Sequence, residues 1–227
     1  MTRRSYDVPL LLALCGLTFF WRLGANGLFD LDEGLYVAAA REMFLSGDYV
    51  TPRINGILFY DKPPLVYWLA AGCFRLFGES IFAARLPSAV ACTLLVLLVY
   101  LFGRHCLGRR AGFLAGAMLC LSPLLGMVAR QMMLDAMLCL CVAVALAGWY
   151  WAETGLGGAA RWAYLLFWVG SALGLLAKGL PGLLLPAATV VSFLLWEERF
   201  RPPAVVRRLE RMQWPIKLPL FLLIALP

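Results

Sequence analysis

Long apolar runs, separated by short charged segments, constrain this sequence more than any other feature. The runs lie at about residues 8–28, 65–77, 82–103, 111–129, 132–152, 162–177, 180–196 and 218–227. A helix needs about 20 apolar residues to cross the hydrocarbon core of a bilayer, and most of these runs approach that length. Hydrophobic residues make up 63% of the chain and charged residues only 15%, unlike the composition of soluble domains. We therefore expect an all-α integral membrane protein, a polytopic helical bundle.

The run at 65–77 is too short to cross a bilayer. Its 13 residues, LVYWLAAGCFRLF, would extend about 20 Å as a helix, whereas the hydrocarbon core is about 30 Å thick. The run also contains Arg75 and follows Pro63-Pro64. We expect a surface or re-entrant helix here, within a large first external loop at 29–81 that contains juxtamembrane helices. The predicted spans are then 8–28, 82–103, 111–129, 132–152, 162–177, 180–196 and 218–227, the last of them truncated.

The distribution of lysine and arginine supports this topology, because short cytoplasmic loops of membrane proteins are enriched in both. With the N-terminus inside, twelve basic residues face the cytoplasm, while the external segments hold eight basic and eight acidic residues. The cytoplasmic set is Arg3, Arg4, Arg104, Arg109, Arg110, Arg161, Arg199, Arg201, Arg207, Arg208, Arg211 and Lys217. If 65–77 crossed the membrane, the basic segment 199–217 would lie outside, contrary to that rule. The net charge of +7 therefore indicates orientation in a membrane, and we expect no nucleic-acid partner.

A polar segment, residues 29–64, separates the first two apolar runs and carries charged side chains at the expected external surface. Its first part predicts a helix that begins with Asp30 or Asp32 as N-cap and stops at Ser46-Gly47. We expect this helix to lie flat on the membrane. Its apolar stripe consists of Leu35, Tyr36, Ala39, Ala40 and Met43. A loop rich in turn-forming residues should follow and end at Asp61-Lys62.

Further charged residues fall at the external ends of the later runs. They are Arg85, Arg130, Asp135 and Lys178. A charged side chain at the centre of a membrane helix costs roughly 2.5–3.5 kcal/mol, so such a set is expected around a polar cavity. The alternative is that each side chain only caps a helix end or extends to the lipid headgroups. The glycines and proline of Lys178-Gly179-Leu180-Pro181-Gly182 predict a tight external turn, in which the lysine is well placed to bind phosphate.

Several motifs of the polar segment occur together in one group of membrane enzymes. They are Asp32-Glu33, Tyr36, Arg41-Glu42-Met43, Ser46-Gly47-Asp48 and Lys62-Pro63, followed by Tyr67-Trp68. The arrangement resembles the first external loop of the bacterial aminoarabinose transferase and protein-mannosyltransferase-like families, and Asp135 and Lys178-Gly179 match their later external-loop motifs. One difference is Asp61, where these families usually carry Glu. The resemblance implies the C-type glycosyltransferase fold, with residues 1–227 as the N-terminal part of a chain more than twice as long.

The resemblance also implies a function. It is the transfer of a sugar from a polyprenyl-phosphate carrier to a lipid A-type lipid, another glycan or a protein, with inversion at the anomeric carbon. The essential acid of these families falls on Asp32, beside Glu33, so we expect this pair to be catalytic. The remaining expected site residues are Lys62, Lys178, Arg85 and Arg130 for the donor phosphate, with Asp61, Asp135 and Tyr36 beside them.

The expected location is the bacterial inner membrane, with the active site facing the periplasm. If the acceptor is a hydroxyl, Asp32 can act as general base. If the acceptor is a phosphate, the acid would position it through a divalent metal, or bind the ammonium group of an amino sugar. With one histidine in the chain, no histidine-rich set indicates a tightly bound metal. Two alternatives stay open, a transporter or flippase of lipid-linked sugars and an inactive truncated membrane fragment.

Overall fold

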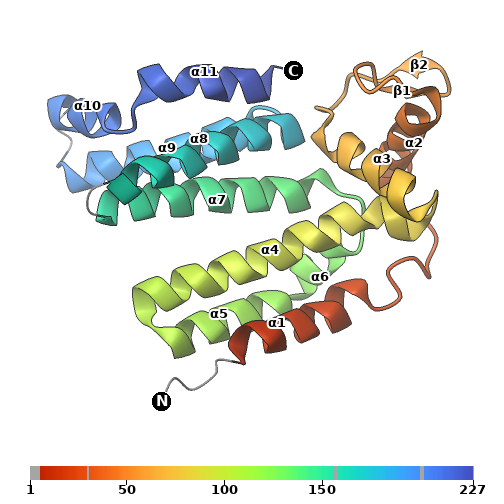
Figure 1. The fold of residues 1–227 in the computed structure, drawn as a ribbon, viewed down its shortest axis with the longest axis horizontal. Coiled ribbons are helices and arrows are strands. Elements are labelled where there is room, and N and C mark those ends of the chain that lie inside the picture. Colours follow the sequence, from red (N-terminus) through yellow and green to blue (C-terminus); the bar gives the residue numbers. More distant parts are fainter. Residues whose placement is uncertain (1–5, 30, 156–157, 200–201, 227) are drawn as a thin grey trace. The chain divides into compact units, whose positions relative to one another are not determined.

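The computed structural model describes residues 6–29, 31–155, 158–199 and 202–226, which are mostly helical (Figure 1). The chain divides into two compact units between residues 140 and 141. The first unit contains α1 (Asp7–Cys15), a π-helix (Gly16–Phe20), α2 (Leu31–Ser46), β1 (Arg53–Ile54), β2 (Ile57–Leu58), α3 (Leu65–Phe77), α4 (Ile81–Leu107), α5 (Arg109–Cys120), α6 (Pro123–Ala129) and the start of α7 (Leu134–Thr154). The second contains the rest of α7, α8 (Gly158–Lys178), α9 (Pro181–Glu197), α10 (Pro202–Glu210) and α11 (Trp214–Ala225).

Helices α1, α4 and α5 pack around one hydrophobic core of the first unit (Figure 1). Leu11 and Phe19 of the first helical stretch are buried there with Val96 and Tyr100 of α4. The backbones of α4 and α5 approach closely at Gly112, where an added Cβ would lie 2.6 Å from the Tyr100 carbonyl oxygen. A larger residue at Gly112 would therefore force the two helices apart.

Helices α2 and α3 and the start of α4 form the second core of this unit. The stripe residues Tyr36, Ala39, Ala40 and Met43 are buried there, and α2 ends at Ser46 before Gly47 (φ +74°), so the predicted helix is confirmed. Their partners on α3 are Val66, Tyr67, Ala70 and Phe74. The stripe therefore packs on α3 inside the protein, and it is not the surface by which α2 would lie on a membrane.

The loop after α2 contains a short β-hairpin that we did not predict. Strands β1 and β2 pair antiparallel, with Arg53 opposite Leu58 and Ile54 opposite Ile57. The two residues between them, Asn55 and Gly56, have φ values of +53° and +76°. Asn-Gly with positive φ at both positions is the preferred two-residue hairpin turn, and the dipeptide was a visible signal for it.

Two of the described helices, Ile81–Leu107 and Leu134–Thr154, are long and apolar enough to cross a membrane. The run predicted as one span at 111–129 is instead two helices, α5 and α6, bent by 63° at a break. Pro123 is the first residue of α6, and its ring and missing N–H oppose a continuous helix. The first run, expected to be helical to residue 28, forms helix only to Phe20.

In the second unit, α8 packs against α9 and α11 (Figure 1). Gly179 has φ +81° and connects α8 to α9, so the predicted turn is confirmed. The two helices lie so close that a Cβ on Gly182 would be 1.9 Å from the Gly174 carbonyl carbon. Such a contact is possible only between two glycines, which explains the glycine content of this hairpin.

Helix α10 lies in the basic segment 199–217. The Arg208 guanidinium forms ion pairs with Glu153 at 2.5 Å, Glu197 at 3.2 Å and Glu198 at 3.2 Å. Val205 of the same helix is buried in the core of the second unit. These contacts attach α10 to the ends of α7 and α9, so the segment is a structured part of this unit.

Candidate active site

Glu33, in the first turn of α2, forms a buried ion pair with Arg85 of α4, 52 residues later in the chain. The Glu33 side chain is fully buried, and the Arg85 side chain is 5% exposed. Two parallel hydrogen bonds join them, from Arg85 Nε to Oε1 at 2.7 Å and from Nη2 to Oε2 at 2.8 Å. This two-pronged geometry is the strongest form of an arginine–carboxylate contact, and it fixes the start of α2 against α4.

The Glu33 carboxylate accepts two further hydrogen bonds. The backbone N–H of Phe29 donates to Oε2 at 2.8 Å, and that of Met132 donates to Oε1 at 2.9 Å. Burial opposes ionisation of Glu33, but the hydrogen bonds from Arg85, Phe29 and Met132 outweigh it and lower its pKa below the usual value. The carboxylate is therefore ionised at neutral pH, and four donors occupy its oxygens.

Arg85 is also fully engaged. Its Nη1 donates to the carbonyl oxygens of Leu23 at 3.0 Å and Asn26 at 3.2 Å, and its Nη2 donates to that of Gly27 at 2.9 Å. With the two bonds to Glu33, all five N–H donors of the guanidinium have partners, and none remains for a phosphate. The geometry therefore favours a positioning role for Glu33 and Arg85, in place of the catalytic and phosphate-binding roles expected from the sequence.

Asp32 is the neighbour of this anchored pair and differs from it in every respect. Its side chain is exposed, and it forms no hydrogen bond or ion pair with any residue that the structure describes. Because α2 begins at Leu31, Asp32 lies inside the first turn and is not the N-cap; Asp30, the other expected cap, lies outside the described residues. The backbone at Asp32 is thus held by Glu33, while its carboxylate is available to a ligand.

The loop before α3 presents a second charged pair. Lys62 Nζ lies 3.1 Å from Asp61 Oδ2, with side-chain exposures of 31% and 56%. Neither group is buried, so their contact is weak and easily exchanged for one with a ligand. The structure therefore leaves Lys62 accessible as a cation.

Tyr36 and Tyr67 bring two phenol rings together between α2 and α3, with centroids 6.1 Å apart. The Tyr67 hydroxyl is buried and has no hydrogen-bond partner within the described part of the chain. Burial and then the charges of Tyr36 and Asp61 raise the pKa of Tyr67, so the hydroxyl stays protonated at neutral pH. An unpaired buried hydroxyl costs about 1–3 kcal/mol. Tyr67 was not among the expected site residues, although it belongs to one of the motifs. No pattern in a sequence indicates that a hydroxyl will be buried without a hydrogen-bond partner.

The other expected site residues are distributed over both units. Arg130 donates to the carbonyl oxygens of Trp21 at 2.7 Å and Thr18 at 3.4 Å, so it caps the end of the π-helix. This supports the helix-capping alternative over phosphate binding. Asp135 is partly buried in the first turn of α7, and Lys178 lies in the last turn of α8, in the second unit.

A divalent metal was a further possibility for the site. Within the described ranges, no group of three or more His, Cys, Asp or Glu side chains is arranged to hold a metal ion. The metal therefore stays a prediction, and no role of Asp32 or Asp61 is derived from it.

Comparison with known proteins places this geometry in a family. Residues 61–224 match the family described as dolichyl-phosphate-mannose-protein mannosyltransferase. The chain belongs to this family. The helical framework of residues 61–224 is therefore that of a mannosyltransferase-family protein, in agreement with the family that the sequence motifs predicted.

Curated relatives carry the names of bacterial sugar transferases. Undecaprenyl phosphate-α-4-amino-4-deoxy-L-arabinose arabinosyl transferase 2 of Pseudomonas fluorescens is 34% identical over 205 residues, which are 87% of this chain and 34% of that protein. The arabinosyl transferase of Pseudomonas savastanoi pv. phaseolicola is 34% identical over 216 residues, 91% of this chain and 40% of that protein. The mannosyltransferase-family chain thus spans between 34% and 40% of the length of these relatives.

Solved structures agree on the fold. ArnT from Cupriavidus metallidurans bound to undecaprenyl phosphate matches 99% of this chain, which covers 41% of ArnT, with a TM-score of 0.89 and 28% identity. The apo form of ArnT gives a TM-score of 0.87. The Saccharomyces cerevisiae protein O-mannosyltransferase Pmt1-Pmt2 complex matches in fold alone, with a TM-score of 0.68 and 18% identity. The family member described here therefore has the all-α membrane architecture of C-type glycosyltransferases.

Proposed function

We propose that the protein containing this chain is a membrane glycosyltransferase that moves a sugar from a polyprenyl-phosphate carrier to an acceptor. The observation that carries the proposal is Asp32, an exposed carboxylate without a partner among the described residues, on a turn anchored by the Glu33–Arg85 pair. The match to ArnT with undecaprenyl phosphate supports it. Because the chain covers 41% of ArnT, we propose the activity for the full-length protein.

The reaction breaks the bond between the anomeric carbon and the carrier phosphate oxygen. An acceptor oxygen bonds to that carbon from the opposite side, so the configuration inverts and the polyprenyl phosphate leaves as an anion. Fixed cations must meet the charge that develops on this phosphate, and we assign that role to Lys62 and Lys178. Their contribution is electrostatic, and it is larger in the transition state than in the bound donor.

The role of Asp32 depends on the acceptor. If the acceptor is a hydroxyl of a glycan or a protein, its proton passes to the Asp32 carboxylate as the new bond forms. If the acceptor is a phosphate of a lipid A-type lipid, it is already anionic and needs no base, and Asp32 binds the ammonium group of an amino sugar. The names of the relatives favour an aminoarabinose donor, and therefore the second role.

Lys62 provides a direct test of donor binding. We expect Lys62→Ala in the full-length protein to raise the KM for the polyprenyl-phosphate sugar by roughly ten- to a hundredfold, the scale of a hydrogen bond to a charged group. The measurement is sugar transfer from a radiolabelled donor in membranes with matched protein amounts. The control is Arg53→Ala, which removes a basic side chain from the same loop. Arg53 donates to the Gly56 carbonyl, at 3.5 Å.

The same assay separates the two functional classes. A transferase produces glycosylated acceptor and free polyprenyl phosphate in equal amounts, whereas a flippase moves intact donor across the membrane. An unchanged KM in Lys62→Ala would mean that Lys62 does not bind the donor phosphate. Translocation of intact donor without transfer by the parent protein would replace the whole proposal with the flippase.

We propose further that the protein lies in the bacterial inner membrane, with residues 30–62 and Lys178 outside and residues 104–110 and 199–217 in the cytoplasm. In a background without native cysteines, a cysteine at Arg53 is expected to react with a membrane-impermeant maleimide in intact cells. A cysteine at Arg207 is expected to react only after permeabilisation. Labelling at Arg207 from outside would contradict the orientation.

A further inference from the structure

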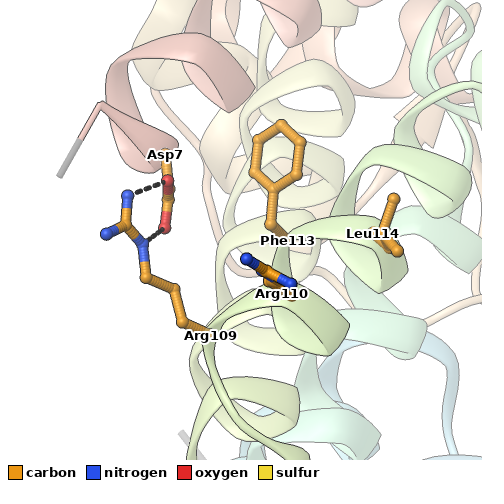
Figure 2. A pocket seen from close by; sticks show the side chains of 5 residues that line it. All are labelled: Asp7, Arg109, Arg110, Phe113 and Leu114. Carbon is orange, nitrogen blue, oxygen red and sulfur yellow. Dashed lines mark hydrogen bonds and ion pairs between the residues drawn. The ribbon is translucent and has the colours of Figure 1, made fainter.

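A cavity of about 420 Å³ lies in the first unit where α1 and α5 begin. Figure 2 shows its lining residues, Asp7, Arg109, Arg110, Phe113 and Leu114. It is remote from the candidate active site. Arg85 of that site lies near the start of α4, whereas the cavity is near the last turn of α4, which contains Arg104. Nineteen residues of helix at ~1.5 Å each separate these positions by about 28 Å. The cavity is therefore a separate feature of the unit.

One ion pair organises the polar side of the cavity (Figure 2). Arg109 donates to Asp7 through Nε at 2.6 Å and through Nη2 at 2.7 Å. The hydroxyl of Tyr100 also contacts Asp7, at 3.1 Å. The negative charge of Asp7 is thus already matched by Arg109, and the pair neither attracts nor repels a further anion strongly.

Arg110 adds a positive charge that nothing in the described chain balances. Its side chain is exposed and forms no hydrogen bond or ion pair with any described residue. Arg104, in the last turn of α4, adds a further guanidinium, which donates to the Tyr100 hydroxyl at 3.3 Å. Three guanidinium groups and one carboxylate therefore meet at this end of the unit, which favours an anionic ligand.

The other side of the cavity is apolar and continues along α5. Phe113 and Leu114 line the cavity itself. Leu114, Met118 and Leu121 follow at helical spacing and are 59%, 73% and 59% exposed. A soluble anion would use only the arginines, whereas a ligand with a charged head and a hydrocarbon chain would use both parts of the surface.

We propose that this cavity binds the phosphate headgroup of an anionic membrane phospholipid. Arg110 and the free edge of Arg109 contact the phosphate, and an acyl chain lies along Leu114, Met118 and Leu121. Bound lipid would tie the beginnings of α1 and α5 to one surface of the membrane. The inference does not depend on sugar transfer, because the cavity lies at the far end of α4 from Asp32.

The test is lipid retention by the full-length protein, measured by native mass spectrometry in detergent. The probes are phosphatidylglycerol and phosphatidylcholine with identical acyl chains. The parent protein is expected to retain phosphatidylglycerol in preference to phosphatidylcholine. Arg110→Gln is expected to weaken the affinity for phosphatidylglycerol about fivefold, which is the effect of one basic side chain near an anionic lipid. Arg75→Gln removes the same charge from the exposed face of α3 and should leave retention unchanged.

Three outcomes would overturn the proposal. Equal losses in Arg110→Gln and Arg75→Gln would mean that only net charge matters, and equal retention of phosphatidylcholine would mean that the headgroup is not recognised. Displacement of phosphatidylglycerol by inorganic phosphate at millimolar concentration would assign the cavity to a soluble anion.

A second measurement needs no substitution. A photoreactive phosphatidylglycerol, with its reactive group on the acyl chain, should label the peptide that contains Leu114 and Met118 in the parent protein. If Arg110→Gln does not fold, this labelling still decides the question, since labelling elsewhere in the unit and not on α5 would overturn the proposal.

Discussion

Asp32→Asn in the full-length protein is expected to lower sugar transfer at saturating donor by roughly a hundredfold or more, because both roles proposed for the carboxylate require its charge; general-base contributions are of this size. Asparagine keeps the size and hydrogen-bonding capacity of the side chain but removes the charge. The Asp32 side chain is exposed and forms no hydrogen bond or ion pair with any described residue, so folding should not change. The measurement is turnover of a radiolabelled polyprenyl-phosphate sugar by matched amounts of the parent and the variant.

Asp48→Asn is the matched control for this substitution. Asp48 is a partly exposed acid of the same polar segment, and its Oδ1 accepts from the backbone N–H groups of Val50 and Thr51, both at 3.1 Å. Asparagine can still accept both bonds, so turnover should stay close to that of the parent. If Asp32→Asn loses less than about fivefold, roughly 1 kcal/mol of barrier, the carboxylate has no catalytic role.

Arg85→Leu is expected to destabilise the protein by about 3–5 kcal/mol, because it leaves the Glu33 carboxylate buried without its partner. The double variant Glu33→Leu with Arg85→Leu should recover part of that loss, since no charge remains buried. The recovery is incomplete because the carbonyl groups of Leu23 and Gly27 lose their donor in both variants. Thermal unfolding of the purified protein in detergent measures both effects.

An exposed ion pair of the same unit is the control for the buried one. Arg41 and Glu79 form a salt bridge with side-chain exposures of 52% and 41%, so Arg41→Leu should cost no more than about 1 kcal/mol. Equal losses in Arg41→Leu and Arg85→Leu would contradict the positioning role of the buried pair.

The pH dependence of stability gives the same pair a second readout. The pKa of Glu33 is lowered in the folded protein, so its contribution is complete above the usual carboxyl value of 4.5 and is lost as the pH falls through the lowered folded value. The parent should therefore lose stability in acid more steeply than the double variant. Parallel stability profiles between pH 3 and pH 6 would count against an ionised Glu33.

The candidate site was predictable in part. Asp32 and Lys62 belong to motifs in the polar segment 29–64, and both are accessible in the structure. Glu33 belongs to the same motif as Asp32, and no local pattern of the sequence indicates which of the two acids is buried. One faces the interior and one faces the solvent because consecutive residues of a helix point about 100° apart, and the ion pair with Arg85 of α4 holds Glu33 in the interior.

The sequence by itself determined the membrane class, the family, and the ranges of α2, α3 and the turn after Lys178. These depend on composition, on helical period and on glycine positions, all of which are local properties. Only the tertiary structure decided what Arg85, Arg130 and Tyr67 do, and that the apolar stripe of α2 is buried under α3. Each of these outcomes depends on contacts between segments tens of residues apart, and a charged or polar side chain looks the same in sequence whether its partner is a ligand, a distant carboxylate or a helix end.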